Sequence, residues 1–241
     1  FLKFVGKTFI VDYDDAIFHN YDLSRNFVLK NLMSKKIFSV MKYADCVISG
    51  NKYIADYAKI AGASRIEVIP TVVDNSKYDP KKNFLHKSPI IGWIGSRSTQ
   101  KYLLNIQEVL SSICKIYGAR LLLVGATSEI ASKFPDINVD IIPWNEEEES
   151  RLIRSMDIGI MPLSNGPWEK GKCGYKLIQY MACGIPTVAS SVGANIDIIR
   201  NSNCGFLADN NDEWKNALVK LLSNREKCIK LGYAGRLAVE E

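Results

Sequence analysis

The chain has 241 residues, of which 47% are hydrophobic and 24% are charged, and its formal net charge is +5. This composition is ordinary for a globular protein, and the length suits one large domain or two smaller ones of about 100–200 residues each. The mild positive charge is compatible with an anionic substrate or with attraction to an anionic membrane surface. It is too weak to indicate a nucleic-acid partner, since no basic stripe with interleaved aromatic residues accompanies it.

The start of the sequence shows no pattern of a targeting segment. No stretch approaches the roughly 20 uninterrupted apolar residues that a membrane-spanning helix needs. Lys3 and Lys7 interrupt the apolar residues at the start, which disfavours a signal peptide. Because the sequence begins with Phe1 rather than methionine, we expect a fragment or a trimmed product.

The cysteines are widely scattered and form no C-x-x-C pair. With His19 and His86 as the sequence's two histidines, this spacing disfavours a zinc site. We therefore expect free thiols in a reducing cytoplasm. The six cysteines are Cys46, Cys114, Cys173, Cys183, Cys204 and Cys228.

Short apolar runs alternate with helical patterns from the start of the chain to Pro70. The predicted strands are Thr8–Val11, Cys46–Ser49 and Ile66–Ile69, and the predicted helices are Arg25–Tyr43 and Lys52–Ile60. Three strands are fewer than the roughly five of an open doubly wound sheet, so we expect residues 1–75 to be a partial Rossmann-like domain. The following stretch is rich in Asp, Asn, Lys and Pro, which predicts a linker over residues 76–87.

From Ile90 onward the alternation becomes more regular. The predicted strands are Ile90–Ile94, Arg120–Val124, Val139–Ile142, Ile158–Met161, Thr187–Ala189 and Gly205–Leu207. Helical patterns fill the gaps, near Lys101–Tyr117, Glu147–Ser155, Tyr175–Cys183, Asn195–Ile199 and Glu213–Leu222. This order predicts an α/β fold with a parallel sheet covered on both faces. We expect one complete Rossmann-like domain at residues 88–223 and a helical tail at 224–241.

The segment from Pro167 to Gly193 carries the strongest chemical signal. Gly171 and Gly174 mark a loop that leads into the helix predicted from Tyr175. A glycine loop at a helix start offers free backbone amides and the positive end of the helix dipole, which suits a phosphate. Lys172 and Lys176 add two positive charges there. The alternative, that both lysines simply face solvent, stays open.

A second candidate site follows the strand Ile90–Ile94, where Gly95 and Ser96 begin a turn before the next helix. Ligands of open α/β sheets bind beyond the carboxyl ends of strands, so this turn is well placed. Arg97 and Lys101 could hold a diphosphate, or could be solvated surface residues. Ser98 or Thr99 could be the N-cap of the helix, which would be a purely structural role.

Several ordered motifs together resemble one family. They are GWIGSRSTQKYL, DIGIMPL, GKCGYKLIQYMACGIPTVAS and GFLADNNDEWKNALVKLL, with further matches at VDYDDAIF, ADCVISGNKYIADYA and VIPTVVD. The chain resembles the retaining GT-B glycosyltransferases of family 4 (glycosyl transferases group 1), and most of all the branch of cell-surface polysaccharide synthesis. The likeness covers Ile90 to Glu241 in order.

This resemblance implies a GT-B-like fold with two Rossmann-like domains, of which the first is truncated here. It implies a nucleotide-diphosphate sugar as donor, a glycan or lipid-linked acceptor, and retention of anomeric configuration without a cofactor or metal. The scattered cysteines and the mild positive charge predict a cytoplasmic protein, with peripheral association at the inner membrane face as an open alternative. The oligomeric state and the identity of the sugar stay open.

The resemblance also assigns residues, and this chain departs from the family pattern at several. Many members carry two glutamates separated by seven residues, the second binding the nucleotide ribose; these positions hold Gly171 and Gln179 here. An amide binds a ribose hydroxyl more weakly than a carboxylate does. The first role falls vacant unless Glu169 or Lys172 fills it. Trp144 lies where the family contacts the base, so it could stack there or pack at an exposed edge.

For catalysis, the leaving diphosphate needs positioned cations and amides as its bond to the sugar breaks. Lys101 matches the family's lysine, whereas the arginine position holds Ser96 and Arg97 lies one step on. We expect Lys176, Lys101 and Arg97 to act as the catalytic cations. The expected donor-binding residues are Gly95, Ser96, Thr99, Trp144, Glu169, Lys172, Gly174, Tyr175 and Gln179.

Three alternatives compete with this hypothesis. A nucleotide-binding fragment without transferase activity is the first, because much of the acceptor half is missing. Asp12 and Asp14, followed by Asp15, resemble the loop of a haloacid-dehalogenase-like phosphatase and could bind magnesium, although its later motifs are not found. A dinucleotide-dependent oxidoreductase would need G-x-G-x-x-G after its first strand, and GWIGSRS lacks that spacing.

Overall fold

A computed structural model describes residues 6–82 and 87–241. Lys3 and His86, the first residues of the expected first domain and part of the expected linker lie outside the described residues. The chain divides into two compact units that do not follow chain order. The first unit consists of Phe1–Thr71, Asn165–Cys173 and Val192–Ala194, and the second of Val72–Ser164, Gly174–Ser191 and Asn195–Glu241.

The first unit contains a three-stranded parallel sheet in the order β1-β2-β3. Its strands are β1 (Ile10–Tyr13), β2 (Cys46–Ser49) and β3 (Ile66–Val68). Its helices are α1 (His19–Asp22), α2 (Phe27–Met33), α3 (Lys36–Tyr43), α4 (Lys52–Ala61) and the short α7 (Pro167–Lys170). The first strand begins two residues later than predicted, and the other two begin as predicted.

The helix predicted over Arg25–Tyr43 is two helices, which separate at Ser34 and Lys35. The two pieces differ in burial. On α3, Ile37 and Met41 are buried in the first unit's hydrophobic core, whereas α2 buries none of its residues. The prediction of one continuous helix was therefore wrong, because the apolar residues before the break do not share the packing face of those after it.

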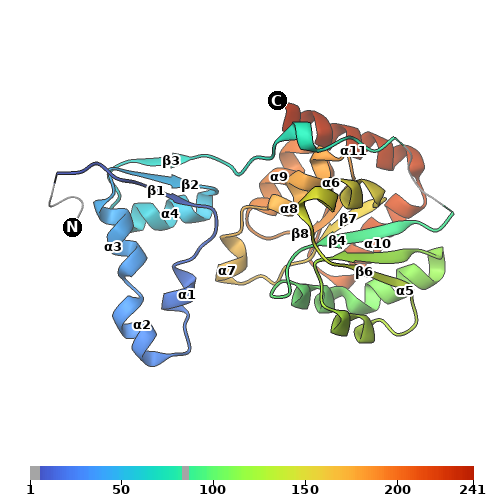
Figure 1. Ribbon diagram of the computed structural model, residues 1–241, viewed down its shortest axis with the longest axis horizontal. Coiled ribbons are helices and arrows are strands. Elements are labelled where there is room, and N and C mark those ends of the chain that lie inside the picture. The colour runs from blue at the N-terminus through green and yellow to red at the C-terminus, as the bar shows by residue number, and fades with distance from the viewer. Residues whose placement is uncertain (1–5, 83–86) are drawn as a thin grey trace. The chain divides into compact units, whose positions relative to one another are not determined.

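The second unit contains a six-stranded sheet, all parallel, in the order β6-β5-β4-β7-β8-β9 (Figure 1). Its strands are β4 (Ile90–Ile94), β5 (Arg120–Val124), β6 (Val139–Ile142), β7 (Ile158–Met161), β8 (Thr187–Ser190) and β9 (Gly205–Ala208). The prediction of an α/β fold with a parallel sheet is confirmed, and the strands agree with the predicted ranges to within one residue.

Helices and 3-10 segments precede, separate and follow these strands. The α-helices are α5 (Gln107–Tyr117), α6 (Glu146–Ser155), α8 (Tyr175–Ala182), α9 (Ala194–Ser202), α10 (Asn211–Leu222) and α11 (Arg225–Glu240). The 3-10 segments are η1 (Asn75–Lys77), η2 (Gln100–Ile106) and η3 (Ser128–Lys133). The helix predicted over Lys101–Tyr117 was wrong in its first part, which is the 3-10 segment η2 followed by α5.

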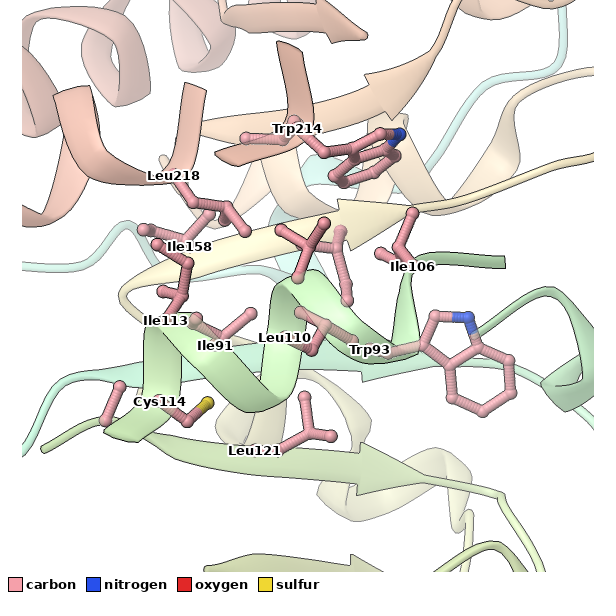
Figure 2. Close-up of a cluster of buried hydrophobic side chains, with 14 of the residues drawn as sticks. Ile91, Trp93, Ile106, Leu110, Ile113, Cys114, Leu121, Ile158, Trp214 and Leu218 are labelled. Atoms are coloured by element: carbon pink, nitrogen blue, oxygen red, sulfur yellow. The ribbon is translucent and has the colours of Figure 1, made fainter. Parts of the chain in front are cut away.

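One face of the six-stranded sheet packs against α5 and α10. Alternate strand residues such as Ile91, Leu121 and Ile158 point toward this face because side chains alternate along a strand. They meet Leu110 of α5 and Leu218 of α10, and Figure 2 shows these side chains interleaved. Burial on this scale explains why the strands read as nearly continuous apolar runs.

The other face accommodates large side chains over small strand residues. A Cβ atom at Gly159 would lie 2.6 Å from the ring of Tyr180 on α8, and one at Gly92 would lie 2.1 Å from the sulfur of Met156. The Tyr180 hydroxyl accepts a hydrogen bond from the Ile94 amide at 3.1 Å. Glycine at these strand positions thus sets how closely the chain can cover this face.

A buried ion pair joins Lys81 to Asp157, the residue directly before β7. Their charged atoms are 2.9 Å apart, and the two side chains are 4% and 0% exposed. The second carboxylate oxygen accepts the Ile90 amide hydrogen at 2.8 Å. The Lys81 ammonium also donates to the carbonyl oxygens of Ser155 and Met156. The pair therefore connects the segment after η1 to the starts of β4 and β7.

All six cysteines are free thiols, as predicted, and all except Cys173 are buried. Burial raises the pKa of the Cys183 thiol to about 12 and that of Cys114 to about 11. None of the helices in residues 6–82 and 87–241 combines the length and apolar character that crossing a membrane requires.

Replacing Asp157 by Asn should lower the free energy of unfolding by about 3–5 kcal/mol, because it leaves the buried Lys81 ammonium without its counter-charge. Denaturant unfolding followed by tryptophan fluorescence measures the change. Asp140→Asn is the matched control, since Asp140 forms an exposed pair with Arg120 at 3.1 Å and should change stability by less than about 1 kcal/mol. Equal losses in the two variants would contradict the assigned role.

Candidate functional site

The carboxyl ends of β4 and β5 come very close together in the second unit. Gly125 has φ of +80°, and a Cβ atom there would lie 2.1 Å from the carbonyl oxygen of Gly95. The Gly95 amide donates to the carbonyl oxygen of Val124 at 3.0 Å. Both positions need glycine, Gly125 for its backbone conformation and Gly95 because a Cβ would lie 2.4 Å from the Trp93 ring.

The turn after β4 is closed by its own hydroxyl groups. The Thr99 hydroxyl accepts the Ser96 amide hydrogen at 3.1 Å and approaches the Ser96 carbonyl oxygen at the same distance. Thr99 occupies the N-cap position of η2 but makes no side-chain cap, so its expected capping role is corrected. Arg97 and Lys101 are exposed, with the Lys101 ammonium 5.2 Å from the centroid of the Tyr102 ring.

Helix α8 begins at a glycine, as the sequence predicts. Gly174 is its N-cap, with φ of +75°, and it offers no side chain to the amides of the first turn. Tyr175 is 41% exposed at the helix start. The ammonium of the half-buried Lys176 lies 5.4 Å from the centroid of the Trp93 ring. The first turn therefore presents backbone amides and a nearby cation at an uncapped helix N-terminus.

A cleft of about 970 Å³ lies in the second unit between the segment that contains η1 and the loop after β6. Trp144, which follows β6, lines this cleft and is 52% exposed. Tyr175, the first residue of α8, lines it as well. The remaining lining residues are Val72, Val73, Asp74, Lys77, Tyr78, Asn145, Glu146, Glu147, Glu149 and Ser150.

Glu149 of α6 connects several residues of this region through its carboxylate. One oxygen accepts hydrogen bonds from the Tyr78 hydroxyl and the Gln179 amide, both at 2.6 Å. The other accepts the indole N–H of Trp144, also at 2.6 Å. Burial, and then the hydrogen bond to Glu149, raises the pKa of Tyr78. The carboxylate thus fixes the orientation of the exposed Trp144 ring.

Gln179 lies on α8 and is 3% exposed. Its amide nitrogen donates to Glu149 and also to the Tyr78 hydroxyl at 3.2 Å. The sequence identified Gln179 as the ribose-binding residue, and that role stays a prediction. In the structure this side chain supports Glu149, and it is Glu149 that lines the cleft.

Sequence reasoning missed Glu149 because it lies in the acidic run Glu146–Glu149 at the start of a helix, where acidic residues favour the helix dipole and need no other explanation. A usable signal was present. Residues three and four positions apart share a helix face. Glu149 precedes the buried Leu152 and Ile153 by these intervals, so it faces inward on α6 rather than toward solvent.

The loop that contains Glu169 and Lys172 belongs to the first unit. The Lys172 ammonium lies 3.6 Å from the Asp15 carboxylate and 5.3 Å from the centroid of the Trp168 ring, and its side chain is 15% exposed. Its charge is therefore already partly balanced within this unit. Glu169 fills the space beside Gly166, where a Cβ atom would lie 2.4 Å from the Glu169 carboxylate.

Backbone contacts hold the same loop in the first unit. A Cβ atom at Gly171 would lie 2.1 Å from the Cβ of Ala16. Asn51 caps α4 by accepting the Ile54 amide hydrogen, and its own amide donates to the Gly171 carbonyl oxygen at 2.9 Å. The cap is a local feature of α4, whereas the bond to Gly171 is a second use of the same side chain that local sequence does not reveal.

The aspartates after β1 have ordinary protein partners. Asp14 accepts a hydrogen bond from the Thr71 hydroxyl at 2.9 Å, and Asp15 faces Lys172. Within residues 6–82 and 87–241, no group of three or more His, Cys, Asp or Glu side chains is arranged to hold a metal ion. The geometry gives no support to the alternative that Asp12 and Asp14 form a magnesium-dependent phosphatase site.

Each of the two units contains a Rossmann-like parallel sheet, and solved glycosyltransferase structures share this fold, which is therefore GT-B-like. Residues 88–224 match the family described as "Glycosyl transferases group 1". The chain belongs to this family.

Similar proteins are consistent with that membership. The chain is 26% identical over 221 residues to a probable sucrose-phosphate synthase of Thermosipho melanesiensis, an alignment of 80% of this chain and 50% of that protein. A sucrose-phosphate synthase structure from Thermosynechococcus elongatus superposes with a TM-score of 0.73 at 20% identity, covering 97% of this chain and 63% of the other. The structure of HepE from Anabaena in complex with UDP and glucose gives 0.75 at 16%, covering 99% and 68%.

These solved structures share the fold at low identity. The chain spans half the length of the Thermosipho relative that it matches.

Replacing Gln179 by Glu should place a second carboxylate against Glu149, and like charges raise the pKa of such a pair. Because the raised pKa belongs to the folded state, the variant should lose stability relative to the unmodified chain as pH rises above about 4.3. Unfolding free energies measured from pH 4 to pH 8 check this. The exchange variant E149Q/Q179E keeps one carboxylate and removes the like-charge repulsion, so its pH-dependent loss should be smaller; an identical loss in both would contradict the contact.

Proposed function

We propose that the protein containing this chain transfers a sugar from a nucleotide-diphosphate donor to a glycan or lipid-linked acceptor, with retention of anomeric configuration and without a metal ion. The family supports the reaction class. Retention, independence of metal, and a place in cell-surface polysaccharide synthesis are supported by the motifs that the chain shares with family 4.

The observation that carries this proposal is that the cleft extends to the first residue of α8. Tyr175 lines the cleft and is also the first residue of the helix. The exposed Trp144 ring offers a stacking surface for a base in the same cleft. A nucleotide with its base at Trp144 would direct its diphosphate toward the amides at the start of α8, the part of a helix best suited to phosphate.

In the proposed reaction, the bond between the anomeric carbon and a diphosphate oxygen breaks, and negative charge builds up on the leaving diphosphate. The amides at Gly174 and Tyr175 and the Lys176 cation stabilise this charge. Arg97, on the turn beyond β4, and Lys101, in η2, are exposed and can add to this stabilisation. Lys172 already has Asp15 as a partner, so we assign it a smaller share.

The proposed donor is a nucleotide sugar, and the UDP in the HepE structure makes a uridine nucleotide the first to test. The chain's net charge of +5 supports weak attraction to an anionic membrane surface, as a cytoplasmic enzyme with a lipid-linked acceptor would need.

Thermal shift measurements with UDP-, GDP- and ADP-linked sugars test the donor, because a ligand that binds the folded state raises its stability. We expect at least one to raise the melting temperature. Binding without product formation by the full-length enzyme would favour a nucleotide-binding protein over a transferase, and no shift with any donor would contradict the proposal.

Lys176→Ala should raise the barrier to transfer by about 2–4 kcal/mol, as loss of an oxyanion-type contact does, which is roughly a 30- to 1000-fold lower kcat. Initial rates with the full-length enzyme measure the effect. Lys215→Ala removes an equal charge from an exposed position on α10 and should leave kcat unchanged. Near-normal turnover of the Lys176 variant would exclude this residue from the site.

A further inference from the structure

We propose that Glu149 binds the ribose of the donor nucleotide, accepting a hydrogen bond from one of its two vicinal hydroxyl groups in the cleft beside Trp144. This inference rests on the proposed function. It assigns to α6 a task that the family resemblance places at position 179 on α8.

The first support is the position of the carboxylate. Glu149 lines the cleft together with Trp144 and Tyr175, whereas Gln179 is 3% exposed and donates its amide hydrogen to Glu149. A ribose whose base stacks on Trp144 would lie near the group to which the Trp144 indole is hydrogen-bonded, and that group is Glu149.

The second support is the remaining acceptor capacity of Glu149. An ionised carboxylate has about four lone-pair sites on two oxygens. Tyr78 and Gln179 occupy one oxygen, and the Trp144 indole donates to the other. The second oxygen can therefore accept a further hydroxyl hydrogen. Three donors hold the carboxylate in place, so little additional ordering is needed when a ligand binds.

The third support is the negative charge of the cleft lining, which favours a ribose over a phosphate as the bound group. Asp74, Glu146 and Glu147 also line it, and the lining cation Lys77 lies 3.5 Å from Glu146. A diphosphate would be repelled by this lining, whereas neutral hydroxyl groups are hydrogen-bond donors that carboxylates accept well. The cleft thus suits the nucleoside, and the phosphates belong at the start of α8.

The test compares UDP, ADP and GDP with their 2′,3′-dideoxy analogues by calorimetry on the purified chain. Hydrogen bonds to a charged group justify an expected loss of about tenfold to a hundredfold in affinity when the hydroxyls are removed. In Glu149→Gln the ratio of the affinity for a nucleotide to that for its dideoxy analogue should fall to near one. Tyr78→Phe removes one donor to the carboxylate but keeps the carboxylate itself, so its ratio should stay close to that of the unmodified chain.

The outcomes separate this inference from the proposed function. Nucleotide binding that ignores the ribose hydroxyls overturns the role of Glu149 and leaves the donor site standing, as does a Glu149→Gln variant that keeps the full ratio. Failure of the unmodified chain to bind any of the three nucleotides overturns the proposed function itself. If Glu149→Gln does not fold, the affinity ratio of the unmodified chain still decides whether the ribose hydroxyls are recognised, and a ratio near one overturns the inference. Binding of free glucose, but of no nucleotide, in the same calorimetry would assign the cleft to a sugar and contradict the inference.

Discussion

The buried pair of Lys81 and Asp157 anchors the wall of the cleft to the sheet. Lys81 follows η1, and its backbone amide donates to the Cys183 carbonyl oxygen at the end of α8. Arg236 of α11 adds bonds from its guanidinium to the carbonyl oxygens of Tyr78 and Ala182. Because two charges without water are stable only when their partners are fixed, this arrangement tolerates little displacement. The segment Val72–Tyr78 is thereby held opposite Trp144, and the cleft keeps its shape.

Much of the second unit could be predicted from sequence because its inner strands β4, β5, β7 and β8 are buried on both faces. Runs such as Arg120–Val124 have an unambiguous apolar pattern, and Gly174 before Tyr175 marks a helix start. The first unit was harder. The break between α2 and α3 depends on which apolar residues pack, and exposed residues such as Phe27 look the same in sequence as buried ones. The 3-10 conformation of η2 likewise has no separate hydrophobic period.

The candidate site was predictable in its local parts and not in its long-range ones. The turn at Gly95 and the helix start at Tyr175 follow from short motifs. The link between Glu149 and Gln179 joins α6 to α8 across 30 positions, and nothing in either helix alone reveals it. The amide at 179 looks like a weakened version of the family pattern when it is considered singly. Beside Glu149 it is one half of a polar pair, in which the amide stands on α8 and the carboxylate on α6.

The assignment of Asn165–Cys173 to the first unit has a consequence for modular engineering of this family. Excising the stretch that matches the family profile, or grafting it onto another scaffold, would separate the loop from Ala16, Asn51 and Asp15. Gly171 would lose its packing surface, and Lys172 its counter-ion. Chimaeras designed by cutting once between sheets would therefore inherit a mismatched loop, so productive exchange has to transplant the β1 turn and the α4 cap along with it.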